Sequence, residues 1–113
     1  MNSDAQSCAN HWNKVVALCS ELAPLGVAVY EHSYSYLSFG SWTLVLGKRK
    51  EVLRFSWDGR EGFVTIQEAL VPDSRGIKDW KELKVQGIDV RDGGEPFAEV
   101  LKFARTKFAA QPL

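Results

Sequence analysis

The chain has 113 residues and a mass of 12.7 kDa, which is enough for one domain with a substantial core. Area scaling gives roughly 18,000 Å² for the unfolded chain and about 6,200 Å² for the folded one. A composition of 45% hydrophobic and 25% charged residues excludes a disordered, collagen-like or low-complexity chain. Fourteen basic residues balance fourteen acidic ones, so no net field draws the chain to nucleic acid or anionic lipid.

The first apolar pattern along the chain predicts a helix. It begins at Ser3 or Asp4, which can cap it, and Pro24 and Gly26 end it. Helical spacing places six residues on one expected buried stripe: Cys8, Trp12, Val15, Val16, Cys19 and Leu22. The two cysteines are separated by roughly 16 Å of helical rise, too far for a disulfide between them. We therefore expect two small buried thiols in a reducing cytosol, and an intermolecular disulfide or a reactive thiol is the alternative.

From Val27 to Leu70 the apolar pattern changes to a period of two, which is typical of strands. It predicts strands at about 27–37, 41–47, 51–57 and 62–70, an irregular connection over 71–82, and a fifth short strand near 83–89. After a turn at Asp92-Gly93-Gly94, Pro96 suits the first position of a second helix. The apolar stripe of that helix is Phe97, Val100, Leu101, Ala104 and Phe108.

The order α-β-β-β-β-β-α predicts one α+β domain over residues 1–113. An antiparallel five-stranded meander with the N-terminal and C-terminal helices packed on one face is the simplest way to bury both helical stripes. This order resembles the arrangement of the frataxin family of iron-binding proteins. That family carries an acidic ridge on its first helix and strand, whereas residues 4–31 hold only Asp4, Glu21 and Glu31 here. The resemblance therefore implies the architecture, and no iron role is carried over.

The turn residues predict the pairing of the strands. Ser38-Phe39-Gly40 fits a three-residue hairpin loop, and residues 47–50 fit a four-residue turn. The first turn pairs Tyr36 with Trp42, Tyr34 with Leu44, and His32 with Leu46; the second pairs Leu44 with Leu53 and Trp42 with Phe55. A third turn at Asp58-Gly59 adds the fourth strand to the same pattern. The helix-covered face is then expected to hold Tyr30, His32, Tyr34, Tyr36, Trp42, Leu44, Leu46, Leu53, Phe55, Trp57, Val64 and Ile66.

Three tyrosines and a histidine alternate along one strand, which is the most unusual feature of the sequence. Aromatic walls with polar tips at a helix–sheet seam favour a pocket for a small aromatic or cationic ligand. The alternative is that these rings only pack in the core and send their polar tips to the rim. The expected ligand-binding residues are Tyr30, His32, Tyr34, Tyr36, Trp42 and Trp12.

The opposite face of the sheet is expected to carry small polar residues and Arg54, and to be solvated or to contact a partner. Arg54, Thr43 and Trp80 are the expected partner-binding residues, because tryptophan and arginine are common at the centres of interfaces. Trp80 lies in the 71–82 connection, and capping the open end of the core is the alternative for it. The basic tip Lys48-Arg49-Lys50 is expected to be a solvated turn rather than a phosphate site.

No phosphate-binding, dinucleotide, metalloprotease or nucleophile motif is present, so we expect no cofactor and no metal, and we lean against an enzyme. The favoured hypothesis is a small cytoplasmic, bacterial-type accessory or immunity-like protein that binds a protein partner or forms a homodimer. A small-molecule-binding protein is the alternative. An enzyme centred on His32, Tyr30 and Tyr34 is a third hypothesis. No apolar stretch is long enough for a membrane span, and the N-terminus has no signal-peptide pattern.

Overall fold

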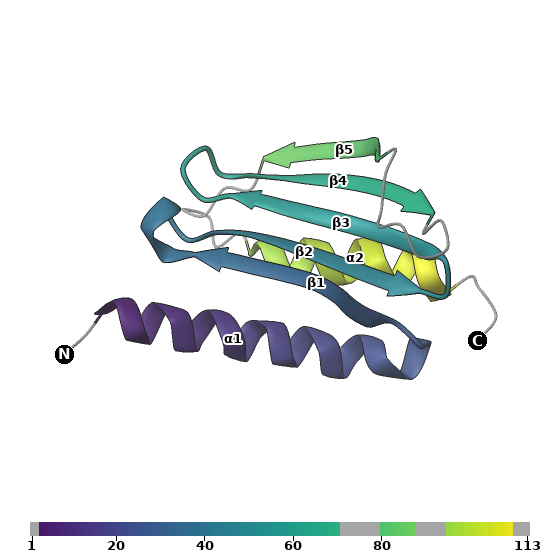
Figure 1. Cartoon of the computed structure of the whole chain (residues 1–113), viewed down its shortest axis with the longest axis horizontal. Coiled ribbons are helices and arrows are strands. Elements are labelled where there is room, and N and C mark those ends of the chain that lie inside the picture. Colours follow the sequence, from purple (N-terminus) through teal and green to yellow (C-terminus); the bar gives the residue numbers. More distant parts are fainter. Residues whose placement is uncertain (1–2, 71–79, 88–94, 110–113) are drawn as a thin grey trace.

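A computed structural model describes residues 3–70, 80–87 and 95–109 of the chain. Its long elements are α1 (Ser3–Leu22), β1 (Ala28–Ser35), β2 (Ser41–Lys48), β3 (Glu51–Asp58), β4 (Phe63–Leu70), β5 (Lys81–Gly87) and α2 (Pro96–Ala109). Two short 3-10 turns, η1 (Ala23–Leu25) and η2 (Tyr36–Ser38), follow α1 and β1. The predicted α-β-β-β-β-β-α order is confirmed (Figure 1).

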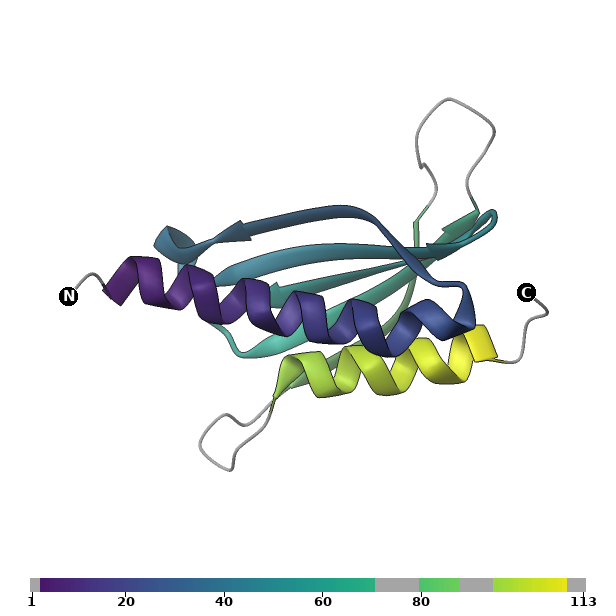
Figure 2. The ribbon, with the colours of Figure 1, turned by 90° about the horizontal axis from the view of Figure 1, so that it is seen from below.

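The five strands form one antiparallel meander in the order β1-β2-β3-β4-β5. Both helices lie side by side on the same face of this sheet, as predicted (Figure 2). The core lies between the two layers and includes Val15, Leu18, Leu22, Trp42, Leu44, Leu46, Leu53, Phe55, Val64, Ile66, Phe97, Val100, Ala104 and Phe108. The opposite face has no helix over it in the described part of the chain, and we call it the helix-free face.

The buried stripe of α1 differs from the predicted one. His11, Val15, Leu18 and Leu22 are buried, whereas Trp12 is 52% exposed and Val16 is 60% exposed. Cys8 and Cys19 are half-buried free thiols. The stripe is rotated because α1 packs on α2 as well as on the sheet edge, so its buried side points between the two. The stripe of α2 is confirmed, with Leu101 partly buried beside it.

The predicted register of the first hairpin is wrong by two residues. Tyr34 pairs with Trp42 and His32 with Leu44, because η2 takes Tyr36 out of the strand and lengthens the connection. The second hairpin is also shifted, with Leu44 opposite Phe55 and Trp42 opposite Trp57. A shift of two residues preserves the side of the sheet that each side chain faces, so most of the predicted core face survives.

The second turn contains two residues rather than four, since Lys48 pairs with Glu51. Arg49 adopts a positive φ of 59°, which fits the turn types that close two-residue hairpins. Lys48 is not a solvated turn residue as predicted: it is only 4% exposed, and its ammonium donates to the Phe108 carbonyl at 3.2 Å. The hydrogen bond satisfies an end carbonyl of α2, where a cation is favourable.

A bulge in β1 moves Tyr30 to the face opposite the one predicted. The pairing passes from Val29–Leu46 directly to Glu31–Val45, so Tyr30 is an extra residue. Its ring covers Gly47 on the helix-free face, and its hydroxyl donates to the Arg49 carbonyl at 2.8 Å. The inserted residue reverses the alternation of side chains at this one point.

Some elements predicted for the middle and the end of the chain fall on residues that the structure does not describe. These are the turn at residues 92–94, residues 88–89 of the predicted fifth strand, and residues 71–79 of the predicted connection. Lys81 and Glu82 belong to β5, so this strand begins before its predicted start. No helix in the described part of the chain is long and apolar enough to cross a membrane.

Candidate functional site

Cross-strand pairing arranges the side chains of the helix-free face in rows across the sheet. One row holds Ser33, Thr43, Ser56, Thr65 and Val85, and the next holds Glu31, Val45, Arg54, Gln67 and Glu82. At the strand ends beside η2, Ser35, Ser41, Asp58 and Phe63 face the same side. Because neighbouring strands lie about 4.8 Å apart, each row presents side chains at a regular spacing.

Arg54 is held in place at the centre of its row. Its Nε–H donates to the Gln67 side-chain oxygen at 2.8 Å, and its guanidinium carbon lies 4.3 Å from the centre of the Trp80 ring. Among the described residues, no carboxylate pairs with it. The two terminal nitrogens of the guanidinium thus remain available as a planar, oriented pair of donors. The structure brings together Arg54 and Trp80, two of the three predicted partner-binding residues.

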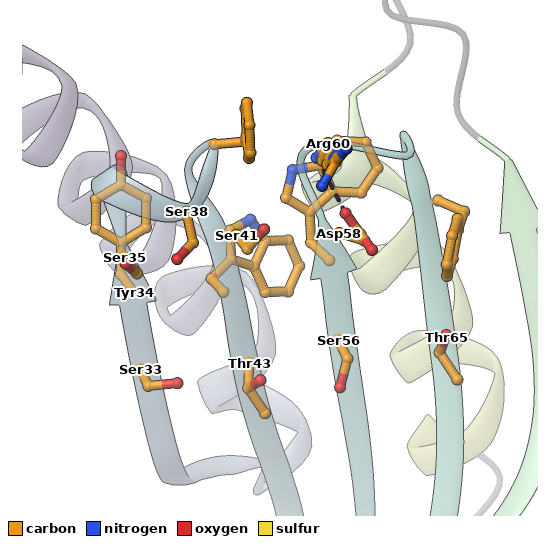
Figure 3. A pocket seen from close by; sticks show the side chains of 14 residues that line it. Ser33, Tyr34, Ser35, Ser38, Ser41, Thr43, Ser56, Asp58, Arg60 and Thr65 are labelled. Carbon is orange, nitrogen blue, oxygen red and sulfur yellow. Dashed lines mark hydrogen bonds between the residues drawn. The ribbon is translucent and has the colours of Figure 1, made fainter.

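The third predicted partner-binding residue, Thr43, lies in a neighbouring concavity of about 640 Å³ (Figure 3). We call it the hydroxyl concavity, because its lining includes seven serine and threonine side chains: Ser33, Ser35, Ser38, Ser41, Thr43, Ser56 and Thr65. Asp58, Arg60, Phe39 and Phe63 lie on its rim. Tyr34, Trp42 and Trp57 complete the lining, so the predicted ligand-binding residues Tyr34 and Trp42 border this concavity. Thr43 lines this concavity, whereas Arg54 and Trp80 do not.

Two loops that meet at the strand ends form the rim of the hydroxyl concavity. The Gly59 N–H donates to the Ser41 hydroxyl oxygen at 2.9 Å, and a Cβ on Gly59 would overlap the Phe39 carbonyl. The Asp58 carboxylate accepts the backbone N–H groups of Arg60 and Glu61, each at 3.0 Å. Glycine at position 59 allows the close approach of the loops, and the rim is fixed by backbone contacts.

On the helix-covered face, His11 of α1 and His32 of β1 form a second polar centre. Their Nε2 atoms are 2.8 Å apart, and His32 Nδ1 is 2.9 Å from the Thr43 carbonyl oxygen. A carbonyl can only accept, so His32 carries its proton on Nδ1, and His11 donates from Nε2 to the bare Nε2 of His32. His32 is therefore neutral in this arrangement. The His11 ring also stacks on Tyr34, with 3.9 Å between ring centres.

Burial lowers the pKa of both histidines. The pKa of His11 falls from 6.5 to about 4, chiefly by desolvation and also through the charges of His32 and Lys14. Desolvation lowers the pKa of His32 as well, against the Thr43 hydrogen bond, which raises it. Desolvation raises the pKa of the Tyr34 phenol. These groups therefore stay uncharged at neutral pH and join α1 to the sheet.

A concavity of about 430 Å³ opens at this helix–sheet seam, and two of the six predicted ligand-binding residues line it. These are Tyr34 and Trp42, together with His11, Trp57 and the Lys14–Glu95 ion pair at 3.0 Å. Trp12, Tyr30 and Tyr36 are not among its lining residues, and His32 lies behind His11 and borders a separate small concavity. Because Tyr30 is on the other face, the site of His32, Tyr30 and Tyr34 considered for an enzyme is not assembled.

Sequence reasoning missed His11, Phe39, Asp58 and Arg60. His11 shares the spacing of Val15, Leu18 and Leu22, so the rotated stripe was detectable as an alternative. Phe39, Asp58 and Arg60 lie in two different turns, and no spacing within either turn indicates that the turns meet. The described residues contain no group of three histidines, cysteines or carboxylates placed to hold a metal ion.

Comparison of the chain with protein-family models, curated proteins and solved structures gives no significant match. The function is therefore argued from the geometry of the sites themselves.

Proposed function

We propose that the protein is a non-enzymatic interaction module whose partner protein binds the helix-free face at Arg54 and Trp80. The observation that carries this proposal is the fixed guanidinium of Arg54, stacked on Trp80 and hydrogen-bonded to Gln67. A guanidinium that is already oriented loses little side-chain entropy on binding, and its planar donors match a carboxylate. The partner is thus expected to present an aspartate, a glutamate or a chain-terminal carboxylate.

The surroundings of Arg54 support this assignment. Tryptophan and arginine are enriched among the residues that dominate binding energy at interfaces. Trp80 is half-buried, and the row of Arg54 also contains the exposed Glu31 and the half-buried Gln67. An aromatic centre with a polar surround supports an interface on this face.

The seam concavity favours a second function, the binding of a small molecule. It is lined by aromatic rings and by the opposite charges of Lys14 and Glu95, within the size range of ligand pockets. Tyr34 and Trp42 would contact such a ligand. A thermal-shift screen against metabolites and aromatic cations tests it, and a hit that Tyr34→Phe abolishes would support it.

The proposed partner site is tested by affinity capture with purified variants. Wild-type protein is immobilised, incubated with lysate of the source cells, and compared with Arg54→Ala and Trp80→Ala. We expect to capture a partner whose affinity for each variant is about 30-fold lower than its affinity for wild type. Residues at interface centres contribute about 2 kcal/mol or more to binding. Arg54→Lys is also expected to weaken binding, because it keeps the charge but not the planar fork.

Arg105→Ala is the matched control, because it removes a side chain of the same type from another part of the fold. Arg105 lies on α2 and forms an exposed ion pair with Glu21. It should retain the partner. Thermal melting of every variant shows whether the fold is preserved. A captured protein that binds Arg54→Ala and wild type equally would disprove the proposed site.

A further inference from the structure

We propose that the hydroxyl concavity is a binding site for an uncharged saccharide. The site lies beside the Arg54–Trp80 centre and does not include either residue. Its volume of about 640 Å³ is within the range that small-molecule sites occupy. This inference is independent of the proposed partner, because different residues carry it.

The hydroxyl groups of the floor are available to a ligand. Within the described chain, the side chains of Ser33, Ser35, Ser38, Thr43, Ser56 and Thr65 make no hydrogen bond to another residue. Ser41 accepts one hydrogen bond from Gly59 and keeps its own proton to donate. A hydroxyl both donates and accepts, and so does each hydroxyl of a sugar. Figure 3 shows Ser33, Thr43, Ser56 and Thr65 on neighbouring strands of one face, with Ser38 in the turn after β1.

The charges of the rim favour a neutral ligand over an anion or a cation. Asp58 and Arg60 contribute one charge of each sign to the lining. One oxygen of Asp58 accepts the two backbone N–H groups, and the other makes no hydrogen bond within the described chain. A fixed carboxylate oxygen and a nearby guanidinium can accept from and donate to neighbouring sugar hydroxyls. An apolar ligand would instead bury the floor hydroxyls without partners, at a cost of about 1–3 kcal/mol each.

Aromatic rings complete the site. Phe39 is 67% exposed and holds a positive φ of 59°, a conformation that is an outlier for a bulky residue. The guanidinium of Arg60 lies 5.8 Å from the centre of its ring. Strained residues concentrate at ligand sites, where surrounding structure holds them in place. The exposed ring provides an apolar surface for the C–H face of a sugar.

The test is a two-dimensional amide NMR titration of the full chain with cellotriose and maltotriose. Trigalacturonic acid serves as the anionic saccharide. We expect saturable shifts for residues of the hydroxyl concavity with at least one neutral trisaccharide, and weaker binding of the acid. Ser56→Ala and Thr43→Val should each weaken the neutral complex about three- to tenfold, and Phe39→Ala should also weaken it.

Ser20→Ala is the matched control, since Ser20 lies exposed on α1 and hydrogen-bonds only to the backbone there. Neither it nor Arg54→Ala should change saccharide binding. The proposal is overturned if neither neutral trisaccharide shifts the concavity residues, or if the variants bind as wild type does. Tighter binding of the acid than of both neutral sugars would also overturn it, and would indicate an anion site at Arg60.

Discussion

His11 and His32 are a neutral pair whose hydrogen bond depends on proton count. His32 has a bare Nε2 because its Nδ1–H is used by the Thr43 carbonyl, so one proton lies between the two rings. Protonation of His32 would place two N–H groups against each other. At the scale of single residues, the attachment of α1 to β1 is therefore sensitive to acid.

We expect the stability of the protein to fall between pH 6.5 and pH 4. The unfolded histidines bind protons near pH 6.5, whereas the folded pKa of His11 is about 4, so the unfolded state binds more protons in this window. The contribution of the histidines to the free energy of unfolding is fully present above pH 6.5, and it decreases as the pH falls toward 4. With solvent screening, the loss is on the order of 1–2 kcal/mol. Urea unfolding at each pH measures it.

The control is the double variant His11→Asn, His32→Asn, which has no histidine, since the chain contains two. Its stability should be flat between pH 6.5 and pH 5, above the range where carboxylates titrate. NMR titration of the wild-type imidazoles gives the pKa values directly. A folded pKa at or above 6.5 for both rings would contradict the neutral pair.

At the scale of the elements, both edge strands of the sheet contain a bulge. In β1 the extra residue is Tyr30, and in β5 it is Leu83, between the partners of Ile66 and Gln67. Bulges and edge lysines hinder the addition of a further strand, and β5 carries Lys81 and Lys84. The Tyr30 bulge also covers Gly47 with an aromatic ring, a pairing that stabilises glycine in a strand.

Gly47→Ala is expected to destabilise the protein by about 1–3 kcal/mol, because its Cβ would overlap the ring of Tyr30. In a Tyr30→Ser background the same change should cost little, so the double-mutant cycle should show a coupling above about 0.5 kcal/mol. Gly87→Ala is the control, since nothing lies near its Cβ position. Additive effects of Gly47→Ala and Tyr30→Ser in urea unfolding would show that the ring does not lie over the glycine.

At the scale of the whole molecule, two helices cover one sheet face, and no helix among the described residues covers the other (Figure 2). The helix-free face is rich in hydroxyls and charges, whereas homodimer interfaces are more apolar.

We therefore expect light scattering after size exclusion to give the 12.7 kDa mass of one chain at high micromolar concentration. The homodimer expected from the sequence stays a prediction, and this measurement decides it. A mass of twice that value which Arg54→Ala reduces to one chain would identify the helix-free face as a self-interface. The partner that binds at Arg54 would then be a second copy of this chain.

The order of elements, the strand positions and most of the core face followed from local patterns. Apolar periodicity depends on side chains within a few residues of each other, and Gly and Pro mark the ends, so these features were predictable. Arg54 and Trp80 were selected as residue types common at interfaces, and their role in partner binding stays a prediction. Their contact at 4.3 Å was not predictable from their separation in the chain.

Register, the Tyr30 face and the two concavities were decided by tertiary structure. The 3-10 turn after β1 and the bulge at Tyr30 each change the count of residues between partners, which no periodicity records. His11 became the buried residue in place of Trp12 because α2 sets the rotation of α1. The rim of the hydroxyl concavity exists because two loops distant in sequence pack together around Gly59, and such a contact depends on the three-dimensional packing of the strands.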